Sequence, residues 1–144
     1  MTDFEYMAAA HTLILTFAAA RILAGIFHAV QPGRLYWVHL SWLSLAIMFC
    51  LTSFWVFLFY REVEWTLPRL MVVLTAPGLI YVFCSILVTV NASEVASWRE
   101  YFYSVRTSLF VCGTLMVTFI LFVNPFFIGL PILDPSQAPL FVLL

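Results

Sequence analysis

The sequence predicts an all-α integral membrane protein, an antiparallel four-helix bundle with a short irregular C-terminal tail. Hydrophobic residues make up 65% of the 144 residues and charged residues only 9%, whereas soluble globular domains carry about 25% charged residues. Four apolar stretches are each long enough for the roughly 20 residues that cross a bilayer as a helix. Short polar breaks separate these stretches, which places consecutive helices antiparallel.

The first two spans are bounded by a turn and by aromatic residues. We expect the first span over residues 7–30, because Pro32 and Gly33 follow it directly and form a turn. We expect the second span over residues 36–60, with aromatic clusters at both ends. Trp and Tyr gather at the two membrane interfaces, so these clusters mark where the second span enters and leaves the bilayer.

The third span is expected over residues 67–90. Thr66 stands where a helix cap belongs, and Pro68 lies in the first turn, where the missing N–H costs nothing. Pro77 lies near the middle of the span. We expect a kink there, because proline removes a backbone hydrogen bond and clashes with the preceding turn.

The last span follows the longest polar stretch of the chain. Residues 91–106 are predicted to form an interfacial helical turn with Ser93 as its N-cap, leading into a span over residues 103–124. The domain organisation expected is therefore a bundle over residues 1–130 and a proline-rich apolar tail over residues 131–144.

Charge and cysteine usage exclude several classes of protein. The net charge is −1, and the six cations are scattered arginines, so no basic surface for nucleic acid is expected. Cys50, Cys84 and Cys112 each lie inside an apolar run without a C-x-x-C motif, which predicts buried free thiols. Motifs typical of nucleotide-binding proteins, proteases and hydrolases do not occur.

A charged side chain inside the first span is the main candidate for function. Arg21 shares one helical stripe with His11, Gly25 and His28. The opposite stripe consists of Leu13, Phe17, Ala20, Ala24 and Phe27. A charge in hydrocarbon costs at least about 2.5 kcal/mol, yet every Asp and Glu lies near a chain end or in a loop. Backbone carbonyls and Ser/Thr hydroxyls of the other three spans, or another chain, must therefore face Arg21. We predict that Arg21, His11 and Gly25 contact an anion or a partner subunit. For Arg21 a gate or a lipid headgroup contact is also open, and an internal contact that locks helices together is the alternative.

His28 and His39 allow two interpretations. They flank a short hairpin, where histidines of facing helices at one depth can hold haem. A haem or pigment contact at His28 and His39 is one hypothesis, and hydrogen bonds to a carbonyl or lipid headgroup are the favoured one. The spacing lacks further zinc ligands. We expect bound lipids and no cofactor.

Two further expectations concern packing and orientation. Small residues crowd the first span, which predicts that it forms the centre of the bundle or an oligomer contact. The loops that follow the first and third spans carry three arginines against two in the turn around residues 61–69. The positive-inside rule then places both termini outside.

Three aromatic motifs resemble an uncharacterised group of small bacterial multi-pass inner-membrane proteins. They are the run from Arg34 to Trp42, the triplet Glu64-Trp65-Thr66, and Tyr101-Phe102 with Arg106. The resemblance covers residues 7–125 and implies a bacterial inner membrane, without an assigned activity.

We therefore expect a non-enzymatic accessory or scaffold subunit of a larger membrane complex. Its aromatic helix faces would bind membrane lipids and other integral membrane subunits, or a second copy of the chain. One alternative is a small oligomeric transporter or channel that uses His11, Arg21 and His28. A second alternative is a redox subunit that binds haem or quinone.

Overall fold

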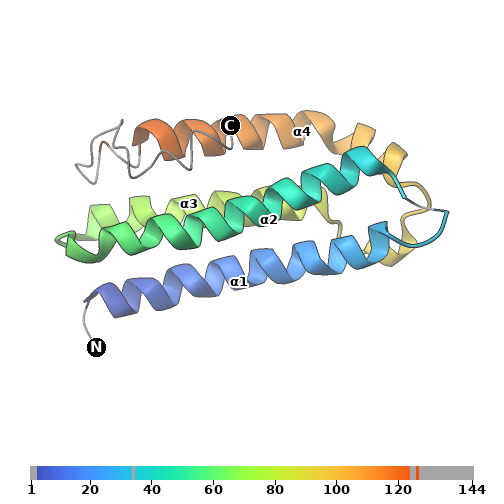
Figure 1. The fold of residues 1–144 in the computed structure, drawn as a ribbon. Coiled ribbons are helices and arrows are strands. Elements are labelled where there is room, and N and C mark those ends of the chain that lie inside the picture. The colour runs from blue at the N-terminus through green and yellow to red at the C-terminus, as the bar shows by residue number, and fades with distance from the viewer. Residues whose placement is uncertain (1–2, 34, 124–125, 127–144) are drawn as a thin grey trace.

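Four long helices run side by side and alternate in direction (Figure 1). The computed structural model describes residues 3–33, 35–123 and 126, so the predicted tail over residues 131–144 lies outside the described residues. The long helices are α1 (Asp3–Ala29), α2 (Trp37–Phe57), α3 (Leu67–Leu87) and α4 (Trp98–Thr118). Three short helices are η1 (Leu58–Glu62) after α2, η2 (Ala92–Glu94) before α4 and a π-helical turn, η3 (Phe119–Val123), after α4.

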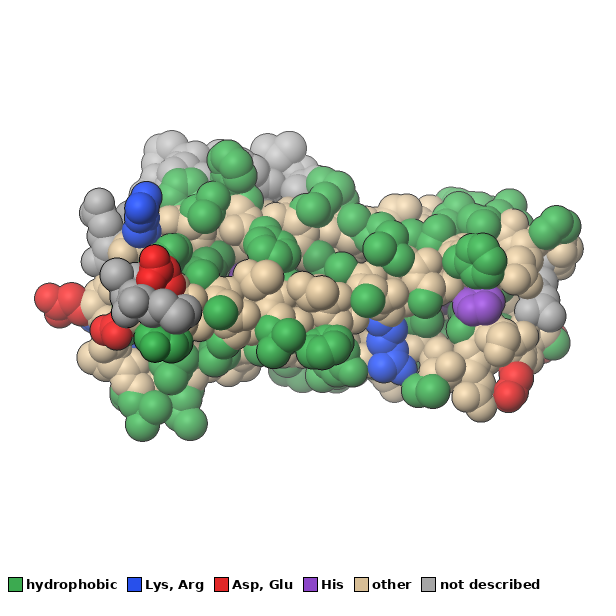
Figure 2. All heavy atoms as spheres, turned by 90° about the horizontal axis from the view of Figure 1, so that it is seen from below, with side chains coloured by type: hydrophobic (Ala, Val, Ile, Leu, Met, Phe, Trp, Pro, Cys, Tyr) green, Lys and Arg blue, Asp and Glu red, His purple; other side chains and the backbone are tan. Residues whose placement is uncertain are grey.

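The predicted fold class is confirmed. The described part of the chain contains helices and no strand, and four of its helices are long and apolar enough to cross a membrane. The chain is therefore an integral membrane protein. Figure 2 shows the side of the molecule that α1 forms: hydrophobic side chains cover most of its length, and acidic side chains gather at its two ends.

The central helix is α3, which packs against each of the other three long helices. Within its most apolar stretch, 44% of the residues are buried, against 28% in α1, 22% in α2 and 17% in α4. The expectation that the first span is the centre was wrong, because small residues indicate a close contact with one neighbour and not contact with all of them. An oligomer contact of α1 stays a prediction.

The two predicted stripes of α1 separate into an inner and an outer face. The buried face is formed by His11, Leu15, Ala18, Ile22, Gly25 and Ala29. The predicted apolar stripe is exposed along its whole length, from Leu13 to Phe27. Arg21 and His28 lie half-buried at the flank of the buried face. The helical wheel thus identified correctly which side of α1 faces the protein.

Gly25 allows α1 and the end of α3 to approach closely. A Cβ atom built on Gly25 would overlap Cγ2 of Val88 and lie 3.1 Å from its Cγ1 and 3.3 Å from its Cβ. Rotating a β-branched side chain such as Val88 cannot clear all three atoms. The absence of a side chain at Gly25 therefore sets the separation of the two helices at this level.

The start of α4 differs from the prediction. The helix begins at Trp98, and its cap is Ser97, whose Oγ accepts a hydrogen bond from the backbone N–H of Glu100. Ser93 is not the cap of this helix: it lies inside the short helix η2, which ends at Glu94 before α4 begins at Trp98. The polar stretch thus contains a separate helical turn, as expected, but α4 begins earlier than expected. The buried Trp98 indole explains the earlier start: Nε1 donates to the carbonyl of His28 at 3.4 Å and fixes this turn to the bundle.

The proline positions in α3 agree with the expected start of this helix. Pro68 lies in the first turn, and Thr66 occupies the N-cap position without a side-chain capping bond. Pro77 lies inside the helix. Since proline has no N–H, the carbonyl of Val73 lacks its usual helical donor. The kink at Pro77 stays a prediction.

We predict that Gly25→Ala destabilises the bundle. The added methyl group must displace Val88, and overpacking of this kind costs about 1–3 kcal/mol. The free energy of unfolding, measured by titration with denaturing detergent in mixed micelles, should fall by that amount. Val88→Ala should restore much of the loss in the double variant, because it removes the overlapping methyl groups.

Gly78→Ala is the matched control in the same protein. A Cβ at Gly78 would meet no heavy atom within 4 Å, and alanine favours a helix over glycine by about 1 kcal/mol. This variant should be as stable as the parent or more stable. Equal stability of Gly25→Ala and Gly78→Ala would contradict the close contact between α1 and α3.

Candidate functional site

Arg21 is held by the C-terminal end of α3. Its Nε donates to the backbone carbonyl of Val88 at 3.2 Å, and its Nη1 donates to the Tyr81 hydroxyl at 3.5 Å. Val88 is the C-cap of α3, where carbonyls lack helical donors and the helix dipole is negative. The backbone carbonyl was among the partners expected for Arg21, whereas the second acceptor is a tyrosine hydroxyl and not the expected Ser or Thr hydroxyl.

A groove lies beside Arg21, between α1 and the end of α3. It measures about 340 Å³, and its polar groups come from Arg21, His28, Tyr81 and Thr89. A second groove of about 330 Å³, lined by Ile14, Phe17 and Tyr81, shares Phe17 and Tyr81 with the first. A cationic side chain interrupts the apolar surface on this side of the molecule (Figure 2). The two grooves together offer a charged end and an apolar end.

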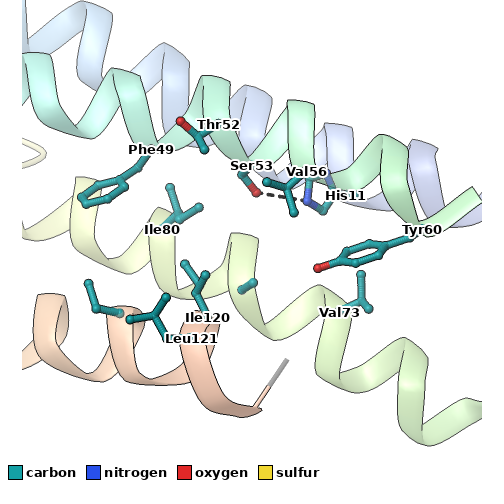
Figure 3. A pocket seen from close by; sticks show the side chains of 12 residues that line it. His11, Phe49, Thr52, Ser53, Val56, Tyr60, Val73, Ile80, Ile120 and Leu121 are labelled. Carbon is teal, nitrogen blue, oxygen red and sulfur yellow. Dashed lines mark hydrogen bonds between the residues drawn. The ribbon is translucent and has the colours of Figure 1, made fainter. Parts of the chain in front are cut away.

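His11 belongs to a different cavity. Its Nε2 lies 3.2 Å from the Ser53 hydroxyl, and its ring stacks on Phe57 at 4.4 Å. The cavity measures about 50 Å³, and the Tyr60 hydroxyl points into it (Figure 3). The wall also includes Val73, whose carbonyl has no helical donor because of Pro77. This space suits a water molecule or a small polar group.

His39 is enclosed by aromatic rings. Its side chain is fully buried, and its ring stacks on Trp98 with centroids 4.6 Å apart and an interplanar angle of 18°. Tyr101 and Phe102 present their rings edge-on at 6.1 and 6.3 Å. Neither ring nitrogen of His39 has a hydrogen-bond partner among the residues that the structure describes. The expected hydrogen bond from His39 to a carbonyl is thus not observed.

His28 and His39 do not face a common space. The Trp98 indole stacks on His39 and donates to the His28 carbonyl, so it connects His39 with the end of α1. The His28 side chain lines the groove beside Arg21. Within the described ranges, no cluster of three or more potential ligands can hold a metal ion. The geometry supports a structural role for His39.

The three cysteines are buried free thiols, as predicted. Cys50 of α2 and Cys84 of α3 belong to one cluster of buried residues, and the Cys112 thiol of α4 lies 4.0 Å from the Leu79 carbonyl. Their spacing along the chain carries no signal for this arrangement, because the contacts form only when three helices pack together.

A groove between α2 and α4 was not predicted from the sequence. It measures about 330 Å³; Phe83 of α3 contributes to its wall, and Trp42 and Phe110 meet edge-to-face at 5.4 Å beside it. On α4 the wall is made of Gly113, Thr114, Val117 and Thr118. The small residues Gly113, Thr114 and Thr118, close together near the end of α4, are the signal that sequence reasoning could have used.

The predicted site residues are therefore distributed over three places. Arg21 and His28 share the groove between α1 and α3, His11 lines the small cavity, and His39 is enclosed in the core. Gly25 lies beneath Val88 and makes room for the contact of Arg21. No family model, curated protein or solved structure matches the chain.

We predict that His39→Phe leaves the protein at least as stable as the parent. The substitution keeps a ring on Trp98 and removes two buried nitrogens without partners, each of which costs about 1–3 kcal/mol. His39→Ala should instead cost about 3 kcal/mol, because it leaves a cavity. The free energy of unfolding in mixed micelles, measured for each of the two variants, tests both expectations. A large loss in His39→Phe would show that the nitrogens bind something.

Proposed function

We propose that the chain is a non-enzymatic accessory subunit of a larger membrane complex. Its groove between α2 and α4 binds a transmembrane helix of a partner subunit. The observation that supports this proposal most directly is the shape and composition of that groove. Its lining residues come from helices that can span the membrane, so an occupant must be as apolar as a lipid chain or a transmembrane helix.

Small side chains favour a helix as the occupant. Lipid tails are as apolar as leucine, so exposed apolar area alone does not drive helix association in a membrane; close packing does. Gly113, Thr114 and Thr118 leave a depression in the surface of α4, and Trp42 and Phe49 stand on the α2 side. A helix that enters this depression can approach the backbone of α4 closely.

The position of α4 in the bundle agrees with such a role. It is the least buried of the four helices, and its contacts with α2 are few compared with its contacts with α3. Phe110 and Thr114, which line the groove from α4, are both exposed. A partner helix beside α4 would complete the packing around it.

The transporter alternative has less support. His11 and Arg21 are ten residues apart on α1, which is about 15 Å along a helix. The side chains of Leu15 and Ala18, which lie between them on α1, are fully buried. Each polar position opens into its own cavity, so the described residues do not form a continuous polar path. A haem ligated by His39 also has less support, because aromatic rings enclose this side chain.

The proposal includes a location and an orientation. We place the chain in a bacterial inner membrane, as the resemblance of its aromatic motifs implies. We place both termini outside, because the loops around Arg34 and Arg99 carry more cations than the turn around Arg61. Topology reporters fused to the N-terminus test this orientation. Activity of a cytoplasmic reporter there would contradict it.

We predict that Thr114→Trp displaces the partner. The exposed Thr114 lines the groove, and an indole at this position would fill it. Affinity purification from native membranes in mild detergent, read by mass spectrometry, should yield a stoichiometric membrane protein with the parent chain. The variant should retain at most about a tenth of this partner protein, which corresponds to a loss of about 1.4 kcal/mol or more of binding free energy.

Leu115→Trp is the control on the same helix. Leu115 is 59% exposed and does not line the groove, so this variant should keep the partner. The accessory-subunit proposal fails if the parent chain purifies as a lone monomer. It also fails if Thr114→Trp releases a second copy of the chain instead of a different protein.

A further inference from the structure

The charge of Arg21 is not balanced by its contacts. The carbonyl of Val88 and the hydroxyl of Tyr81 are both neutral acceptors. A guanidinium has five N–H donors, and the remaining ones have no acceptor among the residues described. Glu94, the acidic residue of the adjoining η2, is exposed and accepts a hydrogen bond from the Asn91 side chain. The groove beside Arg21 therefore has an uncompensated positive charge.

The depth of Arg21 matches the boundary between hydrocarbon and headgroups. The 27 residues of α1 extend over about 40 Å, which exceeds the roughly 30 Å of hydrocarbon by about 10 Å. Arg21 lies eight residues before the end of α1, about 12 Å from it. In a centred helix its Cα is thus several ångströms inside the hydrocarbon, a depth from which a long arginine side chain can reach the headgroups.

The groove continues from this charge along an apolar surface. Phe17 and Tyr81 line both the groove with Arg21 and the second groove, which extends to Ile14. Ile14 and Phe17 precede Arg21 on α1 and therefore lie deeper in the bilayer. An occupant must combine an anionic group at the level of Arg21 with a hydrocarbon chain that runs toward Ile14.

We propose that this groove binds an anionic phospholipid, with its phosphate on Arg21 and one acyl chain along Phe17 and Ile14. The planar guanidinium suits a phosphate, because parallel N–H groups can bind two of its oxygens. The half-buried Thr89 and His28 add polar groups beside the headgroup. This site lies on α1 and α3, so it is separate from the groove between α2 and α4.

Native mass spectrometry of the purified full chain in mild detergent tests the proposal. The probes are phosphatidylglycerol, phosphatidylcholine and inorganic phosphate. The parent chain should retain phosphatidylglycerol over phosphatidylcholine. Arg21→Gln should lower the retention of phosphatidylglycerol at least about tenfold, since it removes a charge-assisted contact. Arg106→Gln, which removes an exposed cation above the Tyr103 ring, should leave it unchanged.

Phe17→Ala keeps the proposal testable if Arg21→Gln does not fold. Phe17 is 59% exposed, so its removal spares the bundle, and it should weaken phosphatidylglycerol binding while the contacts of Arg21 remain. The proposal is overturned if Arg21→Gln keeps the lipid, or if both lipids bind equally. It is also overturned if inorganic phosphate displaces the lipid from the parent chain, or if Arg21→Gln instead releases a bound protein.

Discussion

The contact between α1 and the C-terminal end of α3 is the interaction on which the rest of the structure depends. Gly25 brings the two backbones together at Val88, and Arg21, one turn earlier on α1, reaches the carbonyl of the same residue. A single helix end thus receives a close packing contact and a charged hydrogen bond. This arrangement satisfies part of the hydrogen-bonding capacity of an arginine that hydrocarbon alone would leave without partners.

The central place of α3 has consequences for the surface of the molecule. Because α3 contacts every other long helix, α1 and α4 need not contact each other extensively, and each leaves a groove against a neighbour. The groove beside α1 contains a charge, whereas the groove beside α4 contains glycine and threonine among aromatic residues. These compositions suit different occupants, an anionic lipid in the first case and a helix in the second.

Much of the fold could be predicted from the sequence, because each span is set by local composition. The four helices and the outer stripe of α1 follow from hydropathy and helical period, and the buried thiols follow from their apolar neighbours. The central position of α3 and the early start of α4 could not be predicted. The first depends on which helices meet, and the second on a Trp98 indole that binds the end of α1.

The candidate sites were predicted only in part. Arg21 was identified from its charge, but the identity of its acceptor depends on where α3 ends. The unpartnered nitrogens of His39 and the groove lined by Thr114 arise from contacts between distant segments. Spacing along one helix carries no information about them.

The most direct test of the central claim is a distance measurement in lipid bilayers. Solid-state NMR can detect the dipolar coupling between ¹⁵Nε of Arg21 and the ¹³C carbonyl of Val88. The 3.2 Å separation of Nε from the carbonyl oxygen predicts a clear coupling that disappears in Arg21→Gln. A parent protein without this coupling would show that the end of α3 does not hold Arg21, and the account of the bundle would be wrong.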